Sequence, residues 1–176
     1  MGERFDDQLV LVGARFVLRP LEAGDRAGLT RAASDPAIWE QHPANGRWRP
    51  EVFAPYFDFL LASGGTLAIE DADGIVGCSR YYPVPHAPDD IGIGFTFLTR
   101  AHWGGAANRE VKTLMLDHAF GHFERVWFHI APDNIRSQKG TGKLGAVLEG
   151  RRFLDLAGTG GVETLCYVLP RTEWTG

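Results

Sequence analysis

The chain has 176 residues, 44% of them hydrophobic and 23% charged, and a formal net charge of -4. This composition predicts one globular domain over residues 1–176 and excludes a disordered chain. The acidic balance argues against a broad nucleic-acid-binding surface, and no apolar run is long enough to span a bilayer. Since no signal-peptide pattern is present, we expect a cytoplasmic protein without nucleic-acid or membrane partners.

The first half of the chain alternates strand patterns with helix patterns. The main signals are apolar alternation, Pro50 at a helix start and the hairpin turn Asp71-Ala-Asp-Gly74. Asp25 can cap the first helix, and two glycines in the last strand indicate a bulge or a close backbone approach. These patterns predict strands at 15–21, 66–70, 75–82 and 91–98, and helices at 26–33 and 50–62.

The second half contains the strongest helix pattern of the sequence. Val111, Met115 and Ala119 recur every four residues and predict a buried stripe, whereas Lys112 and other polar residues fall between them. The order of elements indicates a mixed α/β fold, with strands interrupted by helices and a hairpin in each half. The remaining predicted elements are strands at 125–131, 146–154 and 162–169 and a helix that begins at Asn134, as its capping residue, and ends at Gly145.

A turn of small residues, Trp103-Gly-Gly-Ala-Ala-Asn108, precedes the long helix. Small residues let a ligand approach the backbone closely. The first turn of a helix offers free N–H groups at the positive end of its dipole, which suits a pyrophosphate group. The same stretch also fits a tight strand-to-helix turn that binds nothing, and the residues alone leave both interpretations open.

Two longer stretches, WGGAANREVKTLMLDHAF and RVWFHIAPDNIRSQKGTGKLGAVLEG, resemble the GNAT superfamily of N-acetyltransferases. Within it, the chain is most similar to the branch of the ribosomal-protein N-terminal alanine and serine acetyltransferases. The resemblance covers most of the chain and implies a GNAT fold. In that fold a central mixed, mostly antiparallel sheet, flanked by about four helices, is splayed open between its fourth and fifth strands. Acetyl-CoA lies in this opening as cosubstrate and passes its acetyl group directly to a primary amine.

The resemblance also implies which residues meet acetyl-CoA. Backbone N–H groups of the turn hold the pyrophosphate, the strand 91–98 pairs with the pantetheine like an added strand, and an N–H near its end polarises the thioester carbonyl. Asn134 hydrogen-bonds the pantetheine arm, and Ser137 lies near the sulfur. The expected cofactor-binding residues are Phe97, Leu98, Trp103, Gly104, Gly105, Ala106, Ala107, Asn108, Asn134 and Ser137, and no metal is expected.

Two positions that carry chemistry in the family differ in this chain. Thr141 stands where many members have a tyrosine that acts as acid on the departing thiolate, and Gly92 stands where the branch often has a glutamate. Ser137 is therefore the candidate proton donor to the sulfur. Asp90, the nearest carboxylate on the same face, is the candidate base, acting through water.

Several other residues admit more than one role. The histidines show no metal-ligand grouping, and His129 either faces the opening or is a buried structural histidine. Trp39 and Trp48 are either walls of a substrate site or loop anchors. Cys78 and Cys166 lack metal-ligand and redox spacing, so we interpret both as buried strand residues.

The function classes that remain differ in chemistry. The leading one is an acetyl-CoA-dependent N-acetyltransferase whose amine is a protein N-terminus or a small molecule. The alternative is a regulatory CoA-binding module without catalysis, which the missing tyrosine and glutamate permit. A third is an interaction domain that no longer binds CoA. The sequence leaves the amine, the acyl chain and a homodimer open.

Overall fold

The computed structural model describes residues 4–176, so the first three residues of the predicted domain lie outside the described part. Eight strands form one sheet in the order β1-β2-β3-β4-β5-β6-β8-β7. All neighbours in this sheet are antiparallel except β5 and β6, which run parallel. The strands are β1 Leu11–Val12, β2 Val17–Pro20, β3 Thr66–Asp71, β4 Gly74–Pro83, β5 Ile91–Leu98, β6 Arg125–Ile130, β7 Val147–Leu154 and β8 Val162–Pro170.

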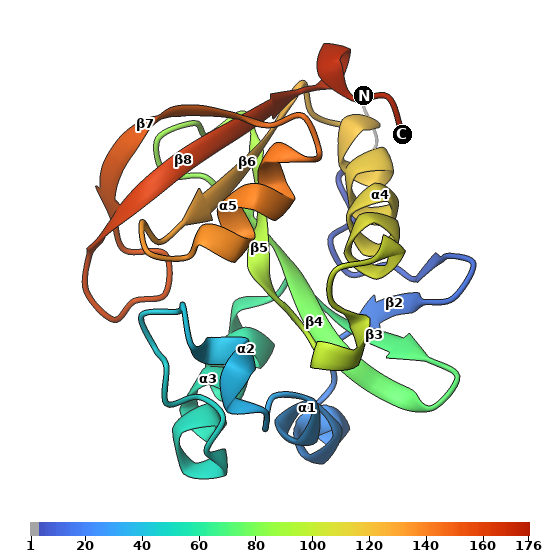
Figure 1. Ribbon diagram of the computed structural model, residues 1–176. Coiled ribbons are helices and arrows are strands. Elements are labelled where there is room, and N and C mark those ends of the chain that lie inside the picture. Colours follow the sequence, from blue (N-terminus) through green and yellow to red (C-terminus); the bar gives the residue numbers. More distant parts are fainter. Residues whose placement is uncertain (1–3) are drawn as a thin grey trace.

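Helices cover both faces of the N-terminal half of the sheet (Figure 1). The helices α1 to α3 pack on the face that carries Ala68, Cys78 and Phe97, and α4 packs on the opposite face. No helix within residues 4–176 combines the length and apolarity needed to cross a membrane. The α-helices are α1 Arg26–Ala32, α2 Pro36–Trp39, α3 Pro50–Ser63, α4 Ala106–Phe120 and α5 Ile135–Gly142.

The predicted strands and helices are all present, and the mixed α/β architecture is confirmed. The short elements β1 and α2 are additional to the prediction. The predicted capping of α1 by the Asp25 side chain is wrong. The Asp25 carboxylate instead accepts the Glu22 N–H at 2.8 Å and pairs with the Arg19 guanidinium at 2.8 Å, because a nearby cation competes for it.

The parallel strands β5 and β6 pair only at their beginnings. Ile91 is opposite Val126 and Gly92 is opposite Trp127, and no further pair joins the two strands in the described chain. Beyond this point the strands run apart (Figure 1), as expected for the fourth and fifth predicted strands. The next part of β5, residues 94–96, is half-buried between fully buried neighbours. Divergence therefore exposes the middle of a central strand whose backbone edge lacks a strand partner.

The glycines of β5 make room for the side chain of Tyr82. A Cβ on Gly92 would lie 2.4 Å from the Tyr82 ring, and a Cβ on Gly94 would lie 3.0 Å from it. Beside them, Phe95 has a φ of 53°, and the β4–β5 register shifts. Both expectations from the glycines are therefore met, since the strand has a bulge and a close approach.

Lys112 on α4 departs most clearly from the helix pattern. It falls between the apolar residues in sequence, yet its side chain is only 6% exposed. Its Nζ donates to Thr96 Oγ1 at 2.6 Å and to Ser79 Oγ at 3.4 Å. The hydroxyl groups of β4 and β5 replace water around an amine that periodicity alone assigns to the polar face.

We predict that Gly92→Ala destabilises the protein by about 1–3 kcal/mol, because the new methyl group would overlap the Tyr82 ring. Gly150→Ala in β7 is the matched control, since no atom of the described structure lies within 4 Å of its Cβ position. The control should stay within about 0.5 kcal/mol of wild type. Urea unfolding measures both, and equal stabilities of the two variants would contradict this packing.

Candidate active site

The turn before α4 has the geometry of an anion site. Gly104 has a φ of 69°, which favours glycine, and Gly105 is the N-cap residue of α4. The N–H groups of the first helical turn, from Ala106 onward, have no partner within the helix. Because Gly104, Gly105 and Ala106 are exposed, these donors and the helix dipole are available to an anion.

An aromatic ring and a cation flank this turn. Trp103 is half-buried, and its Nε1 donates to the carbonyl of Leu98 at the end of β5 at 3.0 Å. The Arg136 guanidinium lies 4.0 Å from the centre of the Trp103 ring and donates to the Ile38 carbonyl at 2.9 Å. Arg136 thus fixes a positive charge between α5, α2 and the turn. Arg136 was not identified from the sequence, where its position between Asn134 and Ser137 was the only indication of a role in the site.

The other expected cofactor contacts lie on α5 and at the end of β5. Asn134 caps α5 as predicted, since its Oδ1 accepts the Ser137 N–H at 3.2 Å. Ser137 is half-buried and Thr141 is 8% exposed. The spacing of Asn134, Ser137 and Thr141 places all three along one helix face. Phe97 and Leu98 bury their side chains on opposite faces of the sheet, which leaves their backbone for contact with a ligand.

Asp90, the candidate base, lies just before β5, at the end where β5 and β6 pair. Its side chain is buried and both neighbours of its carboxylate come from β6. Arg125 Nε lies 2.9 Å from Oδ2, and Trp127 Nε1 donates to the same atom at 2.8 Å. These contacts hold the carboxylate against β6 and do not test a base role. That role for Asp90 stays a prediction.

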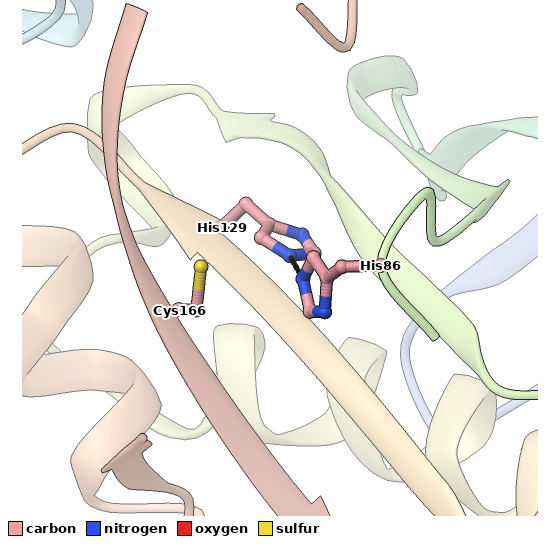
Figure 2. Close-up of side chains that lie close together, drawn as sticks. All are labelled: His86, His129 and Cys166. Atoms are coloured by element: carbon pink, nitrogen blue, oxygen red, sulfur yellow. Dashed lines mark hydrogen bonds between the residues drawn. The ribbon is translucent and has the colours of Figure 1, made fainter. Parts of the chain in front are cut away.

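A cluster of side chains, the Tyr82–His129–His86 chain, lies on the face opposite α4 and was not identified from the sequence. The Tyr82 hydroxyl lies 2.7 Å from His129 Nδ1, and His129 Nε2 lies 2.9 Å from His86 Nε2. Figure 2 shows the two imidazoles meeting, with Cys166 of β8 beside them. His86 also lines a surface pocket with Arg125, Glu149 and others, so the chain links a buried phenol to an open surface.

Burial keeps this chain uncharged at neutral pH. It lowers the pKa of His129 to about 4, with the His86 charge as the next cause, and it lowers the pKa of His86 as well. It raises the pKa of Tyr82. Two neutral imidazoles can share one hydrogen bond as donor and acceptor, so the chain can pass a proton between Tyr82 and the surface.

The same histidines and Cys166 are the described residues that could hold a metal ion. Their ligand atoms lie within 4.8 Å of one another, a grouping that sequence spacing did not indicate. The direct bond between the two Nε2 atoms occupies the space that an ion would need, and burial raises the pKa of the Cys166 thiol. The geometry is that of a hydrogen-bonded chain, and the expectation of no metal stays a prediction.

Of the two tryptophans and two cysteines considered in the sequence, all but Trp48 are buried. Trp39 is buried and its Nε1 donates to the Ala33 carbonyl at 2.8 Å, so it is a loop anchor, whereas Trp48 is partly exposed. Cys78 and Cys166 are free and buried in strands, as predicted.

A family model for the acetyltransferase (GNAT) domain matches residues 15–147. The chain therefore belongs to the GNAT family of N-acetyltransferases. A search of curated protein sequences finds no match.

Solved structures share the fold. A GCN5-related N-acetyltransferase from Brucella melitensis has 19% identity and a TM-score of 0.79, with 97% of this chain and 82% of that chain covered. Mycobacterium smegmatis RimJ in complex with CoA-disulfide has 21% identity and a TM-score of 0.65, with 93% and 86% covered. Spermidine N-acetyltransferase from Vibrio cholerae, in complex with CoA and spermine, has 14% identity and a TM-score of 0.65, with 91% and 98% covered.

We predict that the stability gap between wild type and His129→Gln narrows as the pH falls from about 6.5 towards 4. The pKa of His129 is lower in the folded protein than in the unfolded chain, because burial disfavours the charged imidazole. The stability that neutral His129 contributes is therefore fully present above its pKa in the unfolded chain, and it is lost as the pH falls towards its pKa in the folded protein. Chemical unfolding at several pH values measures the gap. A gap that stays constant over this range would show that His129 titrates alike in both states.

Proposed function

We propose that this chain transfers an acetyl group from acetyl-CoA to a primary amine within the opening between β5 and β6. The observation that carries the proposal is the meeting of two features at one place. The unpaired edge of β5 ends at Leu98, and the free N–H groups at the start of α4 follow it after a short turn. A pantetheine arm has amide groups that suit a strand edge, and its pyrophosphate suits a helix N-terminus.

In the proposed complex, residues 103–108 hold the pyrophosphate, with Arg136 as a nearby positive charge. The backbone of Phe97 and Leu98 pairs with the pantetheine, and the Asn134 side-chain amide donates to it while its Oδ1 caps α5. Ser137, one turn along α5, hydrogen-bonds the sulfur. Holding the amine against the thioester in this opening supplies much of the rate.

The amine must lose a proton during the reaction, and two routes are proposed for it. Asp90 acting through water is the route expected from the sequence. The Tyr82–His129–His86 chain is the second, supported by its unbroken hydrogen bonds and by the position of Tyr82 over Gly92 and Gly94. Gly92 belongs to the last β5–β6 residue pair and Gly94 follows it, so the Tyr82 ring packed over them lies near the point where the two strands separate.

The acceptor is proposed to be either a protein N-terminus or a small-molecule amine. A relative in fold is named RimJ, which supports the branch of ribosomal-protein acetyltransferases, and another acts on spermidine. An α-amine, whose pKa is near 8, needs less help to lose its proton at neutral pH than a lysine or a polyamine. The chemistry thus favours an N-terminal amine without excluding the other.

The test is a panel of peptides with different N-terminal residues, polyamines, amino sugars and amino acids, with released CoA measured as free thiol. We expect acetyl-CoA consumption with at least one amine class and none without amine beyond slow hydrolysis. Tight CoA binding without turnover on the whole panel would instead identify a regulatory CoA-binding module.

Ala106→Asp should lower this activity at subsaturating acetyl-CoA by weakening acetyl-CoA binding about tenfold or more, because its carboxylate would face the pyrophosphate. Ala106 is exposed at the first position of α4, where an acidic side chain does not harm the helix, so the fold should persist. Ala106→Asn is the matched neutral control and should bind within about threefold of wild type, since no charge is added. Calorimetric titration decides, and equal affinities of the two variants would show that this turn is not the anion site.

A further inference from the structure

Lys112 is a buried amine held between the two diverging strands. Its Nζ contacts the hydroxyl of Thr96 on β5 at 2.6 Å and lies 6.0 Å from the centre of the Phe128 ring on β6. Both neighbours come after the last β5–β6 residue pair, Gly92 with Trp127. Lys112 therefore lies at the opening, on the side of α4, and Thr96 is half-exposed there.

Among the residues that the structure describes, no carboxylate forms an ion pair with this amine. Its partners are the neutral hydroxyls of Thr96 and Ser79. Burial lowers the pKa of Lys112 to about 7. A buried amine without an anion destabilises a fold, so a purely structural role would be served as well by methionine or leucine.

The helix that carries Lys112 also carries the proposed pyrophosphate site. Lys112 follows Ala106 by six residues, which corresponds to about 9 Å along the α4 axis. The proposed pantetheine runs from that helix start along β5, whose backbone at Thr96 precedes Phe97 by one residue. The amine thus lies beside β5, along the path proposed for the arm.

The departing sulfur needs a proton donor, and the usual tyrosine is replaced by Thr141. We propose that Lys112 is the acid that protonates the CoA sulfur as the acetyl group leaves. This inference rests on the proposed function. Ser137 can hydrogen-bond the sulfur, but Lys112, unlike a hydroxyl group, can carry a positive charge and give it up as a proton.

The proton and electron counts of the step balance. The amine nitrogen forms a bond to the acetyl carbon, the carbon–sulfur bond breaks, and its electron pair stays on sulfur. The Nζ ammonium gives one proton to that sulfur, forming the CoA thiol and a neutral lysine. The proton lost by the substrate nitrogen passes through its base to water, and the neutral lysine takes up one proton from water before the next turnover, so no other reactant is required.

The groups that face Lys112 do not compete for this proton. On β4, the Ser79 hydroxyl contacts Lys112 and does not titrate in water. Burial raises the pKa of Cys78, on the other face of the same strand, to about 12, so it remains a neutral thiol. Burial also raises the pKa of Tyr81, whose hydroxyl donates to the Met115 carbonyl on α4. The facing groups of β5 and β6, Thr96 and Phe128, do not titrate in water. An anionic thiolate would be the strongest electrostatic partner of the ammonium.

The test compares Lys112→Met with Lys143→Met, a control that removes an exposed lysine at the end of α5. Each protein is saturated with CoA and titrated with base, and the ultraviolet absorbance of the thiolate is read against the desulfo-CoA complex. We expect the acid dissociation constant of the bound CoA thiol to be about tenfold or more larger in wild type than in Lys112→Met, because a nearby ammonium group favours the thiolate. Lys143→Met should match wild type.

A kinetic readout accompanies this titration. Lys112→Met should lower kcat by about tenfold to a thousandfold with little change in the KM for acetyl-CoA, and the fall of kcat at high pH should disappear. The variant should melt at or above the wild-type temperature, because a desolvated amine is removed. If Lys112→Met does not fold, Lys112→Gln replaces it in both measurements.

Three outcomes are distinguishable. Thiol ionisation that agrees within twofold between wild type and Lys112→Met would overturn the role of Lys112 while leaving the proposed function standing. Absence of CoA binding to wild type would overturn the proposed function and this inference with it. A large shift in thiol ionisation together with lost turnover supports both.

Discussion

The hydrogen bonds between β5 and β6 stop after Ile91–Val126 and Gly92–Trp127, and the proposed acetyl-CoA site depends on that termination. A buried strand edge carries N–H and C=O groups that must find partners. Ordinary sheets satisfy them with the next strand, whereas here β6 turns away and pairs with β8. We propose that the edge of β5 instead pairs with a ligand that can hydrogen-bond like a strand.

The surrounding elements supply what such a ligand needs at each end. At the C-terminal end of β5, a glycine with positive φ turns the chain so that α4 starts with free N–H donors, and Arg136 lies against Trp103 beside them. Near the point of separation, Lys112 reaches the opening from α4, and the Tyr82–His129–His86 chain lies on the opposite face. Proton-carrying groups therefore lie on both faces of the sheet, which suits a reaction that removes one proton from nitrogen and adds one to sulfur.

Local patterns and the family resemblance predicted most of this architecture. Strands, helices, the hairpin turn and the Asn134 cap follow from periodicity and turn chemistry over a few residues, so one sequence is enough to find them. The environment of Lys112 could not be predicted that way, because helix periodicity assigns an amine to the polar face and cannot see the Ser79 and Thr96 hydroxyls of two distant strands. The meeting of His86 and His129 depends likewise on tertiary contacts, since 43 residues separate them. The two β5 glycines indicated a close approach, but the sequence did not show that Tyr82 makes it.

Hydrogen–deuterium exchange with and without acetyl-CoA tests the central claim, that the opening between β5 and β6 is the cofactor site, most directly. The account predicts that acetyl-CoA slows exchange in Phe97 and Leu98, in the turn Trp103 to Asn108 and at the start of α5 from Asn134 to Ser137, because these N–H groups or their surroundings become hydrogen-bonded or covered. The hairpin β7–β8, which lies beyond β6, should exchange as before. Protection confined to that hairpin or to α1 and α3, with the three segments unchanged, would contradict it.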